Sequence, residues 1–262
     1  MARQARQESS TGYYHVMARG INNREFLFRR DAEKNRFLEL VKDQQDAELL
    51  KLIAYCVMDN HVHLIIKAAK TCMSKAVKVI SLRFAAYYNR SHNRIGPVFG
   101  DRFRSEKVES DAYLLGALRY IHRNPVKANI VQDVTKYRSS SYSEYLNAVK
   151  YIDEAQKLYV LELFNNSSQS FAEFHVLEDD EKEYLETAED LEKWKAEFAV
   201  KVFERFCEEK GIREGKEIIS NPELFEEICR LLTQQARLSL RETAKLMEVT
   251  HKMVYRALRE DE

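Results

Sequence analysis

Two histidines, His61 and His63, lie two residues apart inside the apolar run 60–66. Side chains on a β-strand alternate between its faces, so we expect both imidazoles on one face and the intervening apolar residues in a core. Two neutral imidazoles side by side make half of a divalent-metal site. Because isolated His-x-His pairs also occur as surface or structural histidines, the interpretation depends on a second element.

That second element is an apolar helix pattern that begins near Asp111, its predicted N-cap, and ends at Pro125. Tyr120 and Asn124 are four residues apart and share one helix face. The amide oxygen is a candidate third metal ligand, and the phenol is a candidate nucleophile. A Tyr/Asn pair alone would favour simple packing and helix capping, but the His-x-His pair reverses that preference.

Several blocks together resemble the single-tyrosine HUH nucleases of insertion-sequence transposases and REP-associated tyrosine transposases. His61-Val62-His63 fits the histidine-hydrophobe-histidine pattern, and the resemblance covers about the first 140 residues. The other blocks are residues 14–20, 55–60, 96–99 with Arg102 and Phe103, and 120–125.

The resemblance implies a function for each candidate. His61 and His63 would bind a divalent cation, Mg²⁺ or Mn²⁺, and Asn124 would complete the protein ligands. Tyr120 would attack single-stranded or hairpin DNA and form a 5′-phosphotyrosine intermediate. A homodimer is compatible with this family, because some relatives exchange the tyrosine helix between subunits.

The order of predicted elements is β-α-β-β-α-β. This order indicates an α+β, ferredoxin-like sheet, followed by the tyrosine helix. The turn at Asp59-Asn60 predicts a hairpin that leads into the histidine strand. The predicted strands are 13–18, 52–58, 61–66 and 104–108, and the predicted helices are 31–46 and 74–89.

The charges of the chain are segregated. Lys and Arg number 42, as do Asp and Glu, but residues 1–140 hold 25 basic against 14 acidic side chains, a net of +11. Residues 141–200 hold 5 against 15, a net of −10. A basic first domain with interleaved aromatic residues favours single-stranded DNA as its partner, although several aromatics fit a core equally well. The predicted DNA contacts of this domain are Arg19, Lys67, Arg83, Arg102, Arg104 and Arg123.

Three segments follow from these patterns: a nuclease domain at 1–146, an acidic helical connector at 147–200, and a DNA-binding domain at 201–262. In the last, residues 240–247 and 251–259 flank a three-residue turn and resemble a helix-turn-helix, which reads duplex DNA. Glu248 stands where that turn commonly has glycine. The predicted contacts of the second helix are His251, Lys252, Tyr255 and Arg256. A plain helical hairpin used for dimerisation is the alternative.

The polar N-terminus has no secretory pattern, and no apolar run approaches the roughly 20 residues that span a bilayer, so we expect a cytoplasmic protein without a membrane partner. The four cysteines lack metal-finger spacing and are expected to be reduced thiols.

Two other classes of function remain open. A DNA-binding regulator would keep the first domain as an inactive relic. A metal-dependent hydrolase would activate water instead of tyrosine, with Asp59 or Asp101 as its only evident candidate bases.

Overall fold

A computed structural model describes residues 7–21, 27–100, 102–176, 184, 188–212, 215–234, 236 and 238–259. The chain divides into two compact units, residues 1–185 and 186–262.

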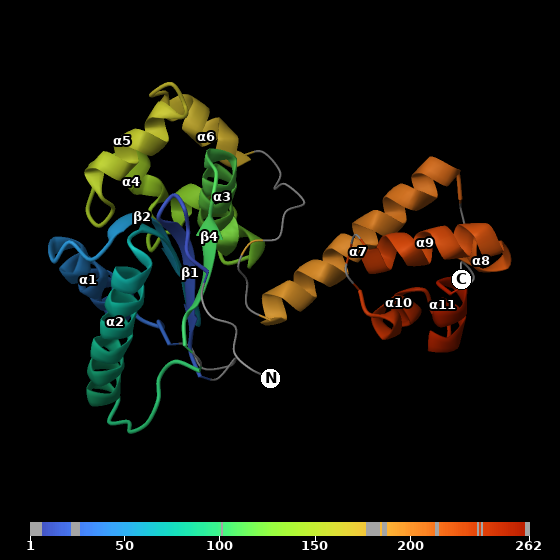
Figure 1. The fold of residues 1–262 in the computed structure, drawn as a ribbon, viewed down its shortest axis with the longest axis horizontal. Coiled ribbons are helices and arrows are strands. Elements are labelled where there is room, and N and C mark those ends of the chain that lie inside the picture. Colours follow the sequence, from blue (N-terminus) through green and yellow to red (C-terminus); the bar gives the residue numbers. More distant parts are fainter. Residues whose placement is uncertain are drawn as a thin grey trace. The chain divides into compact units, whose positions relative to one another are not determined.

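The first unit is built on a four-stranded antiparallel sheet with the order β2-β3-β1-β4. This order and the succession β-α-β-β-α-β confirm the predicted α+β, ferredoxin-like fold. Figure 1 shows α1 and α2 side by side next to the sheet, with α3 on its other side. The bounds are β1 Tyr13–Arg19, α1 Asp31–Asp46, β2 Lys51–Val57, β3 His61–Lys67, α2 Lys70–Ser91, β4 Arg104–Val108 and α3 Asp111–Lys127.

The hairpin of β2 and β3 meets at the predicted turn. Lys34 of α1 is buried and donates a hydrogen bond from Nζ to Oδ1 of Asp59 at 2.8 Å, and another to the hydroxyl of Tyr137 at 3.0 Å. That hydroxyl in turn donates to the backbone carbonyl of Val57 at 2.8 Å. The turn that leads into the histidine strand is therefore fixed from two sides. Cys56 is fully buried in β2.

Helix α3 differs from the prediction at both ends. Its N-cap is Ser110, whose side chain accepts a hydrogen bond from the backbone N–H of Tyr113, so the expected cap at Asp111 was wrong by one residue. Pro125 lies inside the helix, which ends at Lys127. A proline in the last turn removes only one backbone donor, and the N–H of Ala128 still bonds the carbonyl of Asn124 at 3.0 Å.

A chain of hydrogen bonds joins α3 to β2 through His122. Its Nε2 lies 2.8 Å from Oγ of Ser141, which also accepts the backbone N–H of Tyr55 at 2.9 Å. Its Nδ1 lies 2.8 Å from Nε2 of His175, whose Nδ1 donates to the carbonyl of Phe171 at 2.8 Å. Each ring nitrogen has a partner, and the rings are buried, so the chain fixes the rotation of α3 against the sheet.

Residues 147–176, in the segment predicted as an acidic helical connector at 147–200, belong to the first unit and pack on its β2 and α3. The carboxylate of Glu144 is buried and accepts the backbone N–H groups of residues 150–152, while the Tyr55 hydroxyl donates to it at 2.6 Å. Phe171 is buried and stacks on Tyr145 with ring centroids 4.8 Å apart. Although the composition of the predicted connector is acidic, this part of it has an apolar face that packs on β2 and α3. The elements of the first unit that follow α3 are η1 Val134–Lys136, α4 Tyr142–Leu146, α5 Glu154–Glu162 and α6 Ser168–Val176, and the last two lie in this segment.

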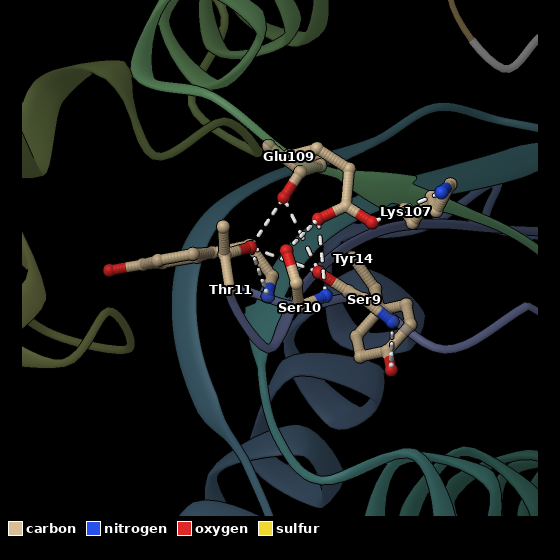
Figure 2. A network of polar contacts seen from close by, with 8 residues as sticks. Ser9, Ser10, Thr11, Tyr14, Lys107 and Glu109 are labelled. Carbon is tan, nitrogen blue, oxygen red and sulfur yellow. Dashed lines mark hydrogen bonds and ion pairs between the residues drawn. The ribbon is translucent and has the colours of Figure 1, made fainter.

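The residues before β1 are fastened to the end of β4 (Figure 2). Ser10 bonds the carboxylate of Glu109 through its backbone N–H at 3.1 Å and through its hydroxyl. Thr11 donates its hydroxyl to the carbonyl of Val108, and the N–H of Ser9 donates to the hydroxyl of Tyr14 at 3.0 Å. These bonds hold edge strand β4 in register with β1.

The second unit contains α7 Ala188–Lys210, α8 Gly215–Ser220, α9 Pro222–Gln234, α10 Leu240–Leu246 and α11 His251–Ala257. Ser239 and Glu242 form a capping box at the start of α10. Glu248 has a φ of 53°, the left-handed conformation that the turn of a helix-turn-helix requires. A non-glycine residue thus adopts the left-handed conformation at the position where the turn commonly has glycine, at a modest conformational cost.

The His122 chain predicts a pH-dependent stability. Burial, reinforced by His175, lowers the pKa of His122 well below its ordinary value, whereas an unfolded imidazole titrates near about 6.5. Below that pH the unfolded state binds a proton that the folded state excludes, so the free energy of unfolding falls as the pH falls from about 6.5 towards 5. We expect His122→Gln to reduce this slope by up to about 1.4 kcal/mol per pH unit. Urea denaturation at several pH values, with hydrogen exchange of β2 amides as the probe, measures this pH dependence of the free energy of unfolding. The same slope in His122→Gln and the wild type would contradict the role assigned to His122.

Candidate functional site

Strand β3 presents His61 and His63 on one face, as predicted. Their ring centroids are 4.9 Å apart, and the side chains are 4% and 1% exposed. The intervening Val62 and the next alternate residue, Leu64, are buried in the core. The alternation of a strand between the faces of the sheet therefore places the two imidazoles together.

Hydrogen bonds at Nδ1 orient both rings. Nδ1 of His61 lies 2.6 Å from Oδ1 of Asn60, an oxygen that only accepts, so this nitrogen carries the proton. Nδ1 of His63 lies 3.0 Å from Nε2 of His15 on β1. Burial lowers the pKa of His63 well below its ordinary value, with smaller contributions from His61 and His15, so the ring is neutral. Nε2 of His63 is buried and makes no hydrogen bond.

Helix α3 lies over this face and brings Tyr120 to it. The ring centroid of Tyr120 is 5.7 Å from that of His63 and 6.2 Å from that of His15. Nδ2 of Asn124 donates a hydrogen bond to the Tyr120 hydroxyl at 3.1 Å, which confirms the predicted shared helix face. Nζ of Lys127 lies 4.7 Å from the ring centroid of Tyr120. The tyrosine faces histidines of its own chain.

The donor set fits a divalent cation. A buried imidazole nitrogen with an unused lone pair, as at Nε2 of His63, is what a metal ligand supplies. Within the described residues, no group of three or more His, Cys, Asp or Glu side chains could hold a metal. A third protein ligand beside His61 and His63 would therefore be of another type, and Asn124, which bonds the Tyr120 hydroxyl, offers an amide oxygen on α3.

Two of the predicted DNA-contacting residues lie beside the histidines. Arg19 pairs with His61 across β1 and β3, and directly opposite residues share a face. Arg104 pairs with Met17, which itself pairs with His63, so these three form one row across the sheet. Arg19 is half-buried and Arg104 is exposed.

The other predicted contacts of the first domain have separate places. Arg83 is exposed on α2 and forms an ion pair with α1. Nζ of Lys67 lies 4.6 Å from the ring centroid of Tyr13. Arg123 donates to the carbonyls of the last residues of α6, at 2.8 and 3.3 Å. Arg102 is exposed. These contacts do not bring the four side chains to the histidines.

Of the two candidate bases of the hydrolase alternative, the structure describes one. Asp59 is ion-paired with Lys34 at 2.8 Å. Asp101 lies outside the described residues. Neither supplies evidence for a water-activating base.

In the second unit, one face of α11 is exposed and the other is buried. Val254 is fully buried and Leu258 half-buried, as expected for the inner face. The side chains predicted to contact duplex DNA are exposed: His251, Lys252, Tyr255 and Arg256.

Three residues of the site were not predicted from the sequence. His15 belongs to the motif block 14–20. The alternation of side chains along its strand is the signal that could have placed it on the same face of the sheet as His63. Asn60 precedes the histidines directly. Tyr184 stacks on Tyr120, with ring centroids 5.2 Å apart and an interplanar angle of 26°, and no pattern in its acidic surroundings predicts this contact.

The fold and site define a class of protein: a ferredoxin-like domain in which two histidines of an inner strand face a tyrosine on the following helix. Residues 8–124 match the family model described as "Transposase IS200 like". This match covers the segment that holds the motif blocks, as far as Asn124, and it agrees with the resemblance drawn from them.

Among solved structures, the chain is similar to a REP-associated tyrosine transposase bound to a REP hairpin. The sequence identity is 16% and the TM-score is 0.48, over 60% of this chain and 96% of that one. No curated protein matches the sequence. Within the described segments, none of the helices combines the length and hydrophobicity that crossing a bilayer requires.

Tyr184 predicts a change in reactivity at Tyr120, which is only 2% exposed. A β-carbon at Gly116 would fall within 1.9 Å of the Tyr184 hydroxyl, so glycine there lets the ring lie against α3. We expect Tyr184→Ala to expose Tyr120 and increase its nitration by tetranitromethane several-fold, as measured by peptide mass spectrometry. Tyr159→Ala, which removes a half-buried ring elsewhere in the unit, is the control. Equal nitration in both variants would show that Tyr184 does not shield Tyr120.

Proposed function

We propose that the chain is a single-strand DNA endonuclease and strand transferase in which Tyr120 is the nucleophile. The observation that carries this proposal is the meeting of Tyr120 with His63 across α3 and β3, with ring centroids 5.7 Å apart. The match of residues 8–124 to the transposase family model supports the reaction class. The proposed substrate is single-stranded or hairpin DNA, which the net charge of +11 on residues 1–140 would attract.

His61, His63 and Asn124 would hold Mg²⁺ or Mn²⁺ in this proposal. Bound there, the cation would polarise the scissile phosphate and offset negative charge in the transition state. The Asn124 amide has two functional ends: its oxygen for the cation and its nitrogen for the Tyr120 hydroxyl. The hydrogen bond at 3.1 Å holds the phenol oxygen beside the ligand set.

The covalent step exchanges one phosphoester for another. The Tyr120 oxygen forms a bond to phosphorus and gives up its proton, the bond from phosphorus to the 3′ oxygen breaks, and that oxygen gains a proton. The products are a 5′-phosphotyrosine and a free 3′ hydroxyl. Attack by another 3′ hydroxyl reverses the step and joins strands without an external energy source, because the ester bond is retained.

Several groups position this reaction. Lys127 places positive charge 4.7 Å from the Tyr120 ring centroid, where it would favour the negative charge that develops on the phenol during attack. Arg19 and Arg104 flank the histidines in the sheet register and would bind the DNA backbone. Tyr184 must move, or be displaced by a base, before a phosphodiester reaches the nucleophile, because Tyr120 is buried beneath it.

Labelled hairpin oligonucleotides test the nuclease proposal. With 5′- and 3′-labelled single-stranded DNA and Mn²⁺ or Mg²⁺, we expect covalent adducts that carry the 3′ fragment on a denaturing gel. Tyr120→Phe should abolish them, and His61→Ala should reduce them by about 100-fold or more, since even an outer-shell partner is worth 10- to 100-fold. Chelation should remove them in the wild type.

Tyr87→Phe, on α2, is the matched control and should leave adduct formation unchanged. Cleavage without an adduct would instead indicate a water-activating hydrolase. Absence of cleavage with every hairpin, including those from the flanks of its own gene, would favour a DNA-binding regulator.

The second unit is proposed to bind duplex DNA through α11. Its exposed Lys252 and Arg256 are suited to phosphate contacts in a helix-turn-helix. We expect Arg256→Ala to weaken duplex binding and to reduce the slope of log affinity against log salt by about 1. Arg230→Ala, which removes a cation paired with Glu226 on α9, is the control. Equal salt slopes in the two variants would contradict a phosphate contact at Arg256.

A further inference from the structure

His15 is a buried histidine that the proposed reaction does not use. It is fully buried on β1, and its Nε2 lies 3.0 Å from Nδ1 of His63. The sheet register pairs His15 with Ile65 and Met17 with His63, so His15 and His63 are diagonal neighbours on one face. Its ring centroid is also 6.2 Å from that of Tyr120, so His15 contacts both the ligand strand and the nucleophile.

The bond between the two imidazoles has a direction that decides what His63 can bind. The two ring nitrogens are 3.0 Å apart, and a neutral imidazole has one N–H and one lone pair, so one ring donates and the other accepts. If His15 donates, His63 accepts at Nδ1 and carries its proton on Nε2, which then cannot bind a cation. If His63 donates from Nδ1, its Nε2 lone pair is available.

The surroundings of the pair favour the second direction once a cation is present. Nε2 of His63 and Nδ1 of His15 are both buried and make no hydrogen bond. When His63 donates from Nδ1, a cation can bind the free lone pair at Nε2 of His63. When His15 donates, Nε2 of His63 carries a proton that excludes the cation. The same pattern holds at the other ligand, where Asn60 accepts the Nδ1 proton of His61 at 2.6 Å.

We propose that His15 is a positioning residue that accepts the Nδ1 proton of His63 and thereby directs the Nε2 lone pair of His63 into the metal site. This inference rests on the metal site of the proposed function. A hydrogen-bond acceptor behind a histidine ligand fixes its tautomer and ring orientation and raises its basicity. Here the acceptor is a second imidazole from the neighbouring strand.

Two substitutions separate this role from packing. His15→Phe keeps a flat ring against His63 and Tyr120 but removes the acceptor. His15→Gln loses the ring but can present a carbonyl oxygen near the position of Nε2. Tyr14→Phe is the matched control, because it removes one buried hydrogen bond, from the N–H of Ser9, on the opposite face of the same strand.

The first measurement is metal affinity of the full chain without DNA. Titration with Mn²⁺, followed by calorimetry or electron paramagnetic resonance, should give a dissociation constant raised about 10- to 100-fold in His15→Phe, the range for the loss of a partner behind a ligand. His15→Gln should restore most of this affinity, and Tyr14→Phe should match the wild type. Circular dichroism and thermal unfolding check that each variant is folded.

The second measurement reads the tautomer directly. Long-range ¹H–¹⁵N spectra of the Mg²⁺-loaded chain should show His63 protonated at Nδ1 in the wild type and in His15→Gln, and a mixture of tautomers in His15→Phe. A folded His15→Phe that binds Mn²⁺ as tightly as the wild type and keeps the Nδ1 proton would overturn the role of His15 alone. If the wild type binds no Mn²⁺ and His61→Ala gives the same titration curve, the proposed metal site is wrong and this inference is wrong with it.

Discussion

The two-residue period of β3 is the constraint on which the site depends. Val62, Leu64 and Ile66 are all buried on one face of the sheet, so His61 and His63 must lie on the other face. A slip of one residue in the register would move every side chain of the strand to the wrong side. The apolar residues thus specify the site as strictly as the histidines do, and the same alternation on β1 places His15 beside them.

Helix α3 turns a pair of histidines into a site with a nucleophile. Its position is set by His122, whose two nitrogens lie 2.8 Å from His175 of α6 and 2.8 Å from Ser141, which is in turn hydrogen-bonded to β2. One turn of helix separates Tyr120 from Asn124, so the rotation that His122 fixes also aims both of these side chains. Stability and function meet here, because the buried polar chain that holds the helix also orients the chemistry.

Local patterns predicted much of this protein. Strand and helix order, the shared face of His61 and His63, and the pairing of Tyr120 with Asn124 all follow from periodicities of two and 3.6 residues. The left-handed turn at Glu248 was also placed correctly, since the flanking helices fix where it falls. The end of α3 was predicted wrongly, because a proline in the last turn costs less than one in the middle of a helix.

The sequence by itself determined the fold class, the family resemblance and the candidate ligands, because these depend on residue type and on spacing along the chain. Only the tertiary structure decided which distant residues complete the site. His15 meets His63 across 48 residues of sequence through strand pairing, and Tyr184 reaches Tyr120 from an acidic segment with no distinguishing pattern. The packing of residues 147–176 on β2 and α3 was also decided by the tertiary structure. Contacts between elements far apart in the chain leave no periodic pattern in the local sequence.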